Sequence, residues 1–297
     1  MTNQSAARYV VSAAAARVAG DDPEPNGDFD HARANVLGVR VSAINLQMAV
    51  DMAAQWIDAG RCGYMCLTGV HGVMEAQRDR ELRCILNHAF ITAPDGMPMT
   101  WVGRHQGFTE MDRVFGPDFM AAMCSLSAVR GYRNFLYGGK PGVIDLLSGA
   151  LRKRFPDLQI VGALTPPFSE LTCEQEEEVF SQVRASRPDI VWVGLSTPKQ
   201  ERFMARYFER MRAPLVVGVG AAFDYHSGSI RDCSDWIKRA GLQWLHRLLQ
   251  DPKRLWRRYL RNNPAFLWHM TCQICGLREY ADDSEPAIPH DNGMTAK

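Results

Sequence analysis

The chain has 297 residues, of which 46% are hydrophobic and 23% are charged, and its formal net charge is +1. This length and apolar content are enough to bury a large core, which excludes a fibrous or wholly disordered protein. The balanced charge gives no general signal for nucleic acid, and no apolar run approaches the roughly 18 residues that a membrane-spanning helix requires.

Both ends of the chain are predicted to be flexible. Residues 1–34 form an extension in which Arg17 interrupts an Ala-rich run and a polar segment follows, so a signal peptide is not expected. The only Asp-x-Asp, at 28–30, falls in this extension and is not expected to hold a metal ion. Residues 280–297 are predicted to be a second flexible tail.

The cysteine pattern favours a reducing cytoplasm. The eight cysteines are scattered without a framework of regular spacings. A single C-x-x-C, from Cys272 to Cys275, has no second pair with which to complete a zinc site.

Short apolar runs alternate with amphipathic segments between residues 35 and 231. The runs predict strands at 36–41, 64–67, 89–93, 133–137, 158–162, 189–194 and 215–219. The segments between them predict helices, among them 43–59, 97–105, 174–185 and 198–211. Because the strands are apolar on both faces, the alternation indicates an α/β fold with a parallel sheet flanked by helices. From residue 232 the pattern is entirely helical, which predicts an appendage over 232–279.

Pro94-Asp95-Gly96 is predicted to be a turn between a buried strand and the next helix. In open α/β sheets, ligands bind outside the carboxyl ends of the strands, and a carboxylate there can take a proton from a substrate hydroxyl. Asp95 is therefore the leading candidate for a catalytic residue. The alternative is that Pro-Asp-Gly is only favourable turn chemistry, with Asp capping the helix and Gly allowing positive φ.

The other turns after strands are expected to gather at the same edge of the sheet. Their glycines let backbone amides approach a phosphate, and their lysines and polar side chains can add charge or reach a sugar hydroxyl. The alternatives are plain turns and a solvated helix start. The turn residues in question are Thr68, Gly138, Gly139, Lys140, Pro198, Lys199, Gln200, Glu201, Gly220, Phe223 and Asp224.

Known nucleotide fingerprints fail in these turns. The run from Tyr137 to Gly142 is not a P-loop. The run that begins Gly218-Val219-Gly220 has Phe223 where a dinucleotide fold needs its third glycine. A nucleotide-dependent oxidoreductase is therefore disfavoured, although it stays as an alternative.

The segment 238–261 is strongly basic. It contains eight Lys or Arg residues and one acidic residue, Asp251, and aromatic and leucine residues are interleaved with the basic ones. This pattern is typical of a helix that lies at a membrane surface. The alternatives are a solvated helix face packed on the core, a non-enzymatic membrane adaptor, and nucleic-acid binding, which no reader motif supports.

Six motifs in register resemble the bacterial WecG/TagA/CpsF glycosyltransferase family over residues 36–261. They are Pro94-Asp95-Gly96, R-V-F-G-P-D at 113–118, L-Y-G-G-K-P-G at 136–142, V-G-L-S-T-P-K-Q-E at 193–201, V-G-V-G-A-A-F-D at 217–224 and G-L-Q-W-L-H-R-L at 241–248.

The resemblance implies a Rossmann-like core with a helical C-terminal appendage. It also implies inverting, metal-independent transfer, without a cofactor, of a hexosyl or N-acetylhexosaminyl group from a UDP-sugar to an undecaprenyl-diphosphate-linked acceptor. Such a reaction serves exopolysaccharide or cell-surface glycan assembly. The enzyme is then expected in the cytoplasm, bound peripherally to the inner face of the cell membrane. Which sugar is transferred, and whether the chain forms homo-oligomers, is left open.

The resemblance also implies roles for individual residues. Asp95 is the general base, and Thr68, Arg113 and Gln200 line the substrate pocket. The turns at Gly138, Pro198 and Gly220 bind the UDP-sugar. Arginines of the appendage meet the lipid diphosphate, and these are Arg247, Arg254 and Arg257. The family usually has Asn where this chain has Val70.

Overall fold

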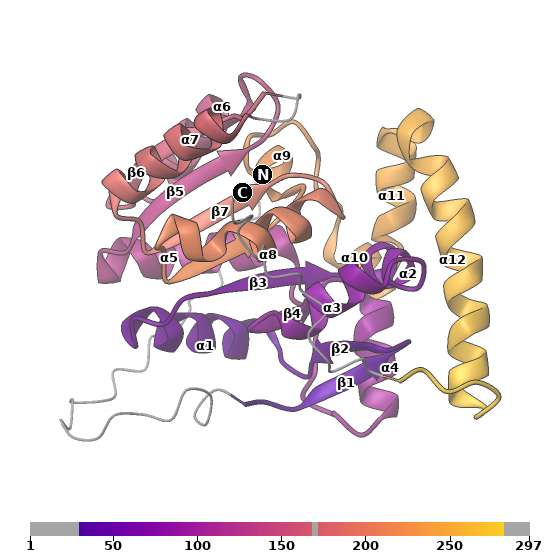
Figure 1. The fold of residues 1–297 in the computed structure, drawn as a ribbon. Coiled ribbons are helices and arrows are strands. Elements are labelled where there is room, and N and C mark those ends of the chain that lie inside the picture. The colour runs from indigo at the N-terminus through magenta and orange to yellow at the C-terminus, as the bar shows by residue number, and fades with distance from the viewer. Residues whose placement is uncertain (1–29, 168–171, 282–297) are drawn as a thin grey trace. The chain divides into compact units, whose positions relative to one another are not determined.

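A six-stranded parallel sheet forms the centre of the fold (Figure 1). Its order is β4-β3-β8-β7-β5-β6, and every neighbouring pair is parallel. The strands are β3 (Gly63–Thr68), β4 (Ile91–Pro94), β5 (Arg133–Gly138), β6 (Gln159–Leu164), β7 (Ile190–Gly194) and β8 (Leu215–Gly218). The predicted α/β class is confirmed, and so are the six predicted strands of the main sheet.

The computed structural model describes residues 30–167 and 172–281, so the predicted flexibility of 1–29 and 282–297 concerns parts outside the described residues. All described helices and strands belong to one unit, which begins at His31.

The first predicted strand, at 36–41, is wrong. The segment is instead a hairpin of β1 (Arg33–Val36) and β2 (Val39–Ser42), which forms its own antiparallel sheet. Leu37 and Gly38 turn the chain with φ of 54° and 81°, as the central residues of a tight hairpin do. The boundary expected for the extension at residue 34 therefore falls inside β1.

Helices cover both faces of the sheet. The helices α1 and α5 pack together on one side, whereas α3, α7 and α8 pack on the other over a continuous hydrophobic core. The helical segment between β3 and β4 is divided in two, because Asp79 caps a new helix by accepting from Leu82 N–H at 3.1 Å. The helices of this part are α1 (Leu46–Asp58), α2 (Val70–Ala76), α3 (Arg80–His88), α4 (Met97–His105), α5 (Gly116–Arg130), α6 (Val143–Arg154), α7 (Cys173–Ser186), α8 (Lys199–Met211) and the short α9 (Ala222–His226).

The C-terminal segment is helical, as predicted. It consists of α10 (Asp235–Arg239), α11 (Gln243–Gln250) and α12 (Pro252–Ile274), and α11 and α12 lie side by side next to the sheet and its helices (Figure 1). The C-terminal half of α12 is anchored, because Phe266 and Met270 join the core and the Gln273 side chain bonds the hairpin backbone. The helices α10 and α11 contain no buried residue. Within residues 30–167 and 172–281, no helix combines the length and apolarity needed to cross a bilayer.

Candidate functional site

A cavity of about 1430 Å³ lies where the strands end, between the sheet and the appendage. Its walls come from the segments that follow β3, β4, β5, β7 and β8, from α4, and from α11 and α12. Most of the candidate residues line it together, namely Thr68, Asp95, Arg113, Gly139, Lys140, Lys199, Gln200, Glu201, Gly220, Phe223, Asp224, Arg247 and Arg254. Three candidates do not line it, and these are Gly138, Pro198 and Arg257.

Asp95 is held at the junction of β3 and β4. Its N–H donates to the Thr68 carbonyl oxygen at 2.9 Å, and the carbonyl of Pro94 accepts from Val114 N–H at 2.9 Å. Gly69 makes this approach possible, because a Cβ on Gly69 would lie 2.3 Å from the Asp95 carbonyl oxygen. The backbone thus fixes where the Asp95 side chain enters the cavity.

Gly69→Ala is therefore expected to displace this turn. The conflict is with backbone and not with a flexible side chain, so we expect a loss of about 2–4 kcal/mol in the free energy of unfolding. Gly149→Ala is the control, because a Cβ there meets nothing within 4 Å and the site lies inside α6. Urea unfolding of both variants measures the difference, and equal stability of the two would contradict the close approach.

The environment of Asp95 suits a group that gains and loses a proton. Burial raises its pKa to about 6, while Arg113 and Arg247 act in the opposite direction. Within the described part of the chain, no hydrogen bond or ion pair engages its carboxylate. At neutral pH the group is mostly ionised and still basic enough to accept a proton from a hydroxyl.

The turns after β5 and β7 lie in close contact through their glycines, which have no side chains to separate them. Gly139 N–H donates to the Gly194 carbonyl at 2.9 Å, and a Cβ on Gly138 would lie 2.7 Å from the same oxygen. The ring of Phe223 fills the space above Gly194, where a Cβ would approach it to 2.3 Å. Gly138 and Phe223 therefore shape the turns, and Gly139 presents backbone to the cavity.

Gln200 and Glu201 point into the protein more than expected, since they are only 2% and 1% exposed. The Gln200 side-chain oxygen accepts from Gly220 N–H at 3.0 Å, and its amide donates to Glu201 at 3.0 Å. Thr197 also donates to Glu201, at 2.9 Å. These bonds tie the turn after β8 to the start of α8, so both side chains hold the shape of the pocket.

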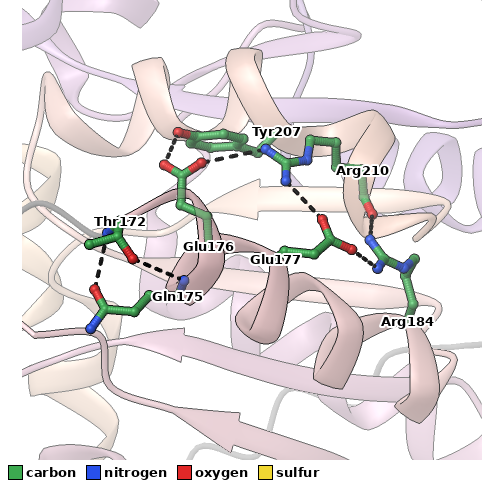
Figure 2. A network of polar contacts seen from close by, with 7 residues as sticks. All are labelled: Thr172, Gln175, Glu176, Glu177, Arg184, Tyr207 and Arg210. Carbon is green, nitrogen blue, oxygen red and sulfur yellow. Dashed lines mark hydrogen bonds and ion pairs between the residues drawn. The ribbon is translucent and has the colours of Figure 1, made fainter.

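Another carboxylate of the lining, Glu176, is engaged in a network between α7 and α8 (Figure 2). It accepts from the Tyr207 hydroxyl and lies 3.5 Å from Arg210, which also pairs with Glu177 at 2.9 Å. Thr172 caps α7 in the same view. Because Glu176 and Glu201 already serve as acceptors, Asp95 is better placed to act as a base than either of them.

Basic side chains outnumber acidic ones around the cavity. They come from the loops, as in Arg113 and Lys140, from the start of α8, as in Lys199, and from the appendage, as in Lys238, Arg247, Arg254 and Arg258. Arg258 lines the cavity where the sequence suggested Arg257, whose guanidinium lies over the exposed Trp256 ring. The reason is helical spacing, since Arg254 and Arg258 are four residues apart and share a face of α12. That spacing was the signal in the sequence that identifies Arg258.

The cavity wall carries polar atoms that lack partners. Among the described residues, five buried side-chain atoms without a hydrogen-bond partner belong to the lining: Thr68 Oγ1, Glu201 Oε2, Tyr225 OH, Gln243 Nε2 and Arg258 Nε. Buried polar groups are normally bonded, so unpaired ones at a cavity wall are available to a polar ligand. In the same described ranges, no cluster of three or more His, Cys, Asp or Glu side chains is arranged to hold a metal ion.

Comparison with known proteins places this site in a family. The model of the "Glycosyl transferase WecG/TagA/CpsF family" matches residues 34–280. A similar protein of Bacillus spizizenii (strain ATCC 23059 / NRRL B-14472 / W23) is called N-acetylglucosaminyldiphosphoundecaprenol N-acetyl-beta-D-mannosaminyltransferase. It is 28% identical over 205 residues, which are 69% of this chain and 77% of the relative. A protein of the same name from Bacillus subtilis (strain 168) is 28% identical over 185 residues, or 62% of this chain and 70% of the relative. The family match covers most of the chain, including every part of the cavity wall, and the chain therefore belongs to the WecG/TagA/CpsF family and is a glycosyltransferase.

Proposed function

We propose that the enzyme transfers an N-acetylhexosaminyl group from a UDP-sugar to a saccharide linked to undecaprenyl diphosphate. The two relatives are named for transfer of N-acetylmannosamine to such an acceptor. The single observation that carries the proposal is the position of Asp95, a carboxylate with a raised pKa at a cavity whose walls supply both glycine turns and appendage arginines. The product serves assembly of a cell-surface polysaccharide.

The reaction is an inverting displacement. A hydroxyl oxygen of the acceptor attacks the anomeric carbon of the donor from the face opposite the diphosphate, and its proton passes to the Asp95 carboxylate. The bond from the anomeric carbon to the UDP oxygen breaks, and UDP leaves with the bonding electrons. A base positioned in this way supplies roughly a hundredfold to ten-thousandfold in rate.

The two diphosphates are assigned to different parts of the cavity wall. The donor diphosphate lies against Gly139 and Gly220 with Lys140 and Lys199, because exposed backbone amides and cations suit a leaving diphosphate. Arg113 neutralises charge close to the base, and Thr68 Oγ1 bonds a sugar hydroxyl. We propose that arginines and amides do this work without a metal ion.

The lipid diphosphate is assigned to the appendage, through Arg247, Arg254 and Arg258. Large apolar side chains are exposed on the same helices, with Leu249 at 75% and Leu260 at 66%. Further exposed apolar side chains of α11 and α12 are Trp244, Leu245, Trp256, Leu267, Trp268 and Ile274. Trp236 of α10, Leu242 before α11 and Leu277 after α12 are exposed as well. Other apolar residues of α12, such as Leu255 and Phe266, are buried, so packing accounts for only some of the apolar side chains in this segment. The exposed part, interleaved with cations, suits docking to an anionic membrane surface, and we place the enzyme on the inner face of the cell membrane.

One assay tests the donor, the acceptor and the membrane together. UDP release from a panel of UDP-sugars is measured with a polyprenyl-diphosphate-linked N-acetylglucosamine in anionic vesicles, and sedimentation of the enzyme with the vesicles is followed in the same samples. We expect one UDP-N-acetylhexosamine to give acceptor-dependent release, and sedimentation that weakens as salt rises. UDP release at the same rate with and without the acceptor would contradict the assigned reaction. Absence of sedimentation would contradict the membrane assignment.

A further inference from the structure

Asn262 is a buried polar residue in the middle of α12, only 2% exposed. Its amide nitrogen lies 3.0 Å from His71 Nδ1, and its side-chain oxygen accepts from Arg78 at 3.1 Å. His71 lies in α2, and Arg78 follows that helix closely. A buried amide is costly unless it is bonded, so these two bonds favour one particular seating of α12 on α2.

His71 joins this contact to the catalytic loops. The residue is part of the cavity wall, two positions after the Gly69 that seats Asp95, and the backbone of Thr197 acts to raise the pKa of its ring. An Nδ1 that accepts from an amide leaves the ring proton on Nε2, so the pattern requires a neutral imidazole. Burial, with a further contribution from Arg258, lowers the pKa of His71 to about 4, which keeps the ring neutral at pH 7.

Asn262 shares a face of α12 with two cavity arginines. Arg258 is four residues before it and Arg254 eight residues before it, and both line the cavity. On the other side of Asn262, the helix is fixed independently by Phe266, Met270 and Gln273. Going from the C-terminal end of α12 toward its N-terminal end, the bonds of Asn262 to His71 and Arg78 are the last described polar contacts with another element before the segment that carries these arginines.

We propose that Asn262 and His71 are positioning residues that set the depth and rotation of Arg254 and Arg258 over the cavity. The inference rests on the proposed function, because it assigns these arginines to the lipid-linked acceptor. Neither residue takes part in the chemistry. Loss of the pair leaves α12 attached through its C-terminal half and displaces its N-terminal half.

The first test compares Asn262→Ala with Thr271→Ala, a change at an exposed position of the same helix whose hydroxyl bonds only within α12. We expect Asn262→Ala to lower kcat/KM for the lipid-linked acceptor roughly tenfold with an unchanged Kd for UDP, and Thr271→Ala to change neither. Amide hydrogen exchange over 243–261 should accelerate only in Asn262→Ala.

The second test uses Asn262→Asp, which places an acceptor opposite Nδ1. The neutral ring can then bond the new carboxylate only by moving its proton from Nε2 to Nδ1, whereas a protonated ring carries a proton on both nitrogens. The carboxylate favours the protonated ring, so the ratio of variant to wild-type kcat/KM should rise from pH 8 to pH 6. The charged groups that face the ring are Glu75, at 3.8 Å, Arg78 and Arg258. A merely structural role for Asn262 predicts a ratio that is constant with pH.

The proposal would be overturned if Asn262→Ala kept the kcat/KM and the hydrogen exchange of the wild-type enzyme. It would also be overturned if Asn262→Ala weakened UDP binding by as large a factor as it lowered kcat/KM. If the wild-type enzyme transfers no sugar, the proposed function fails by itself. Hydrogen exchange still decides whether the pair positions the arginine-bearing half of α12.

Discussion

Asp95→Asn is expected to lower kcat by at least about a hundredfold while UDP still binds. Asparagine keeps the size of the side chain and the backbone bond to Thr68, but it cannot accept the proton of an attacking hydroxyl. The measurement is single-turnover transfer together with a UDP titration. Asp145→Asn is the control, because Asp145 is an exposed carboxylate at the start of α6. Wild-type turnover in Asp95→Asn would remove Asp95 from the mechanism.

The same substitution is expected to stabilise the fold at alkaline pH. The pKa of Asp95 is raised from 3.8 to about 6, so the residue favours the folded state below pH 4 and this contribution is lost as the pH rises through 6. At pH 8 the buried charge therefore opposes folding, by up to about 3 kcal/mol, and asparagine carries no such charge. Urea unfolding at pH 8 and pH 4 should show a gain in stability that shrinks at the lower pH. A catalytic loss accompanied by a gain in stability separates a functional role from a structural one.

Arg258→Gln is expected to lower kcat/KM for the lipid-linked acceptor by about 10–100-fold. The guanidinium lines the cavity and its Nε has no partner among the described residues, which leaves it available to a phosphate oxygen. Arg257→Gln is the matched control, one residue away on the same helix, with its guanidinium over Trp256 and not in the cavity lining. We expect Arg257→Gln to change kcat/KM less than about threefold.

Comparison of Arg258→Gln with Arg257→Gln also distinguishes an effect of charge at the cavity from an effect of charge on membrane binding. Both variants lose one positive charge from α12, so both should weaken vesicle sedimentation by a similar, small amount. If Arg257→Gln impaired transfer as much as Arg258→Gln, the seating of α12 described above would be incorrect.

The strands of the main sheet can be predicted from the sequence because each strand is marked by a pattern in its own few residues. Each buried strand is a short apolar run that ends in a turn residue, and parallel connections bring those ends to one edge, which is why Asp95 was found beside the glycine turns. The hairpin at 33–42 was not predicted because its turn, Leu37-Gly38, lies within the mainly apolar run from Val36 to Val41, which resembles a single strand. A positive φ at Leu37 cannot be inferred from residue type.

The places where the site residues lie differently from what the sequence suggested arise from contacts between distant segments. The inward position of Gln200 depends on Gly220, which a linear pattern does not place beside it. The position of Arg258 at the cavity depends on which face of α12 packs on the core, and the core residues Phe266 and Met270 meet segments far away in the chain. Motif resemblance indicated Arg257, and the structure places its neighbour Arg258 in the cavity wall.

The pH dependence of the chemical step tests the central assignment most directly. Single-turnover transfer with saturating donor and acceptor is measured from pH 5 to pH 8 in the wild-type enzyme and in Asp95→Asn. Because the base must be ionised, the wild-type rate should be level above a break near pH 6 and fall about tenfold per pH unit below it, and the residual rate of Asp95→Asn should show no such break. A wild-type rate that stays level down to pH 5, or the same break in both proteins, would contradict the role of Asp95 as the base.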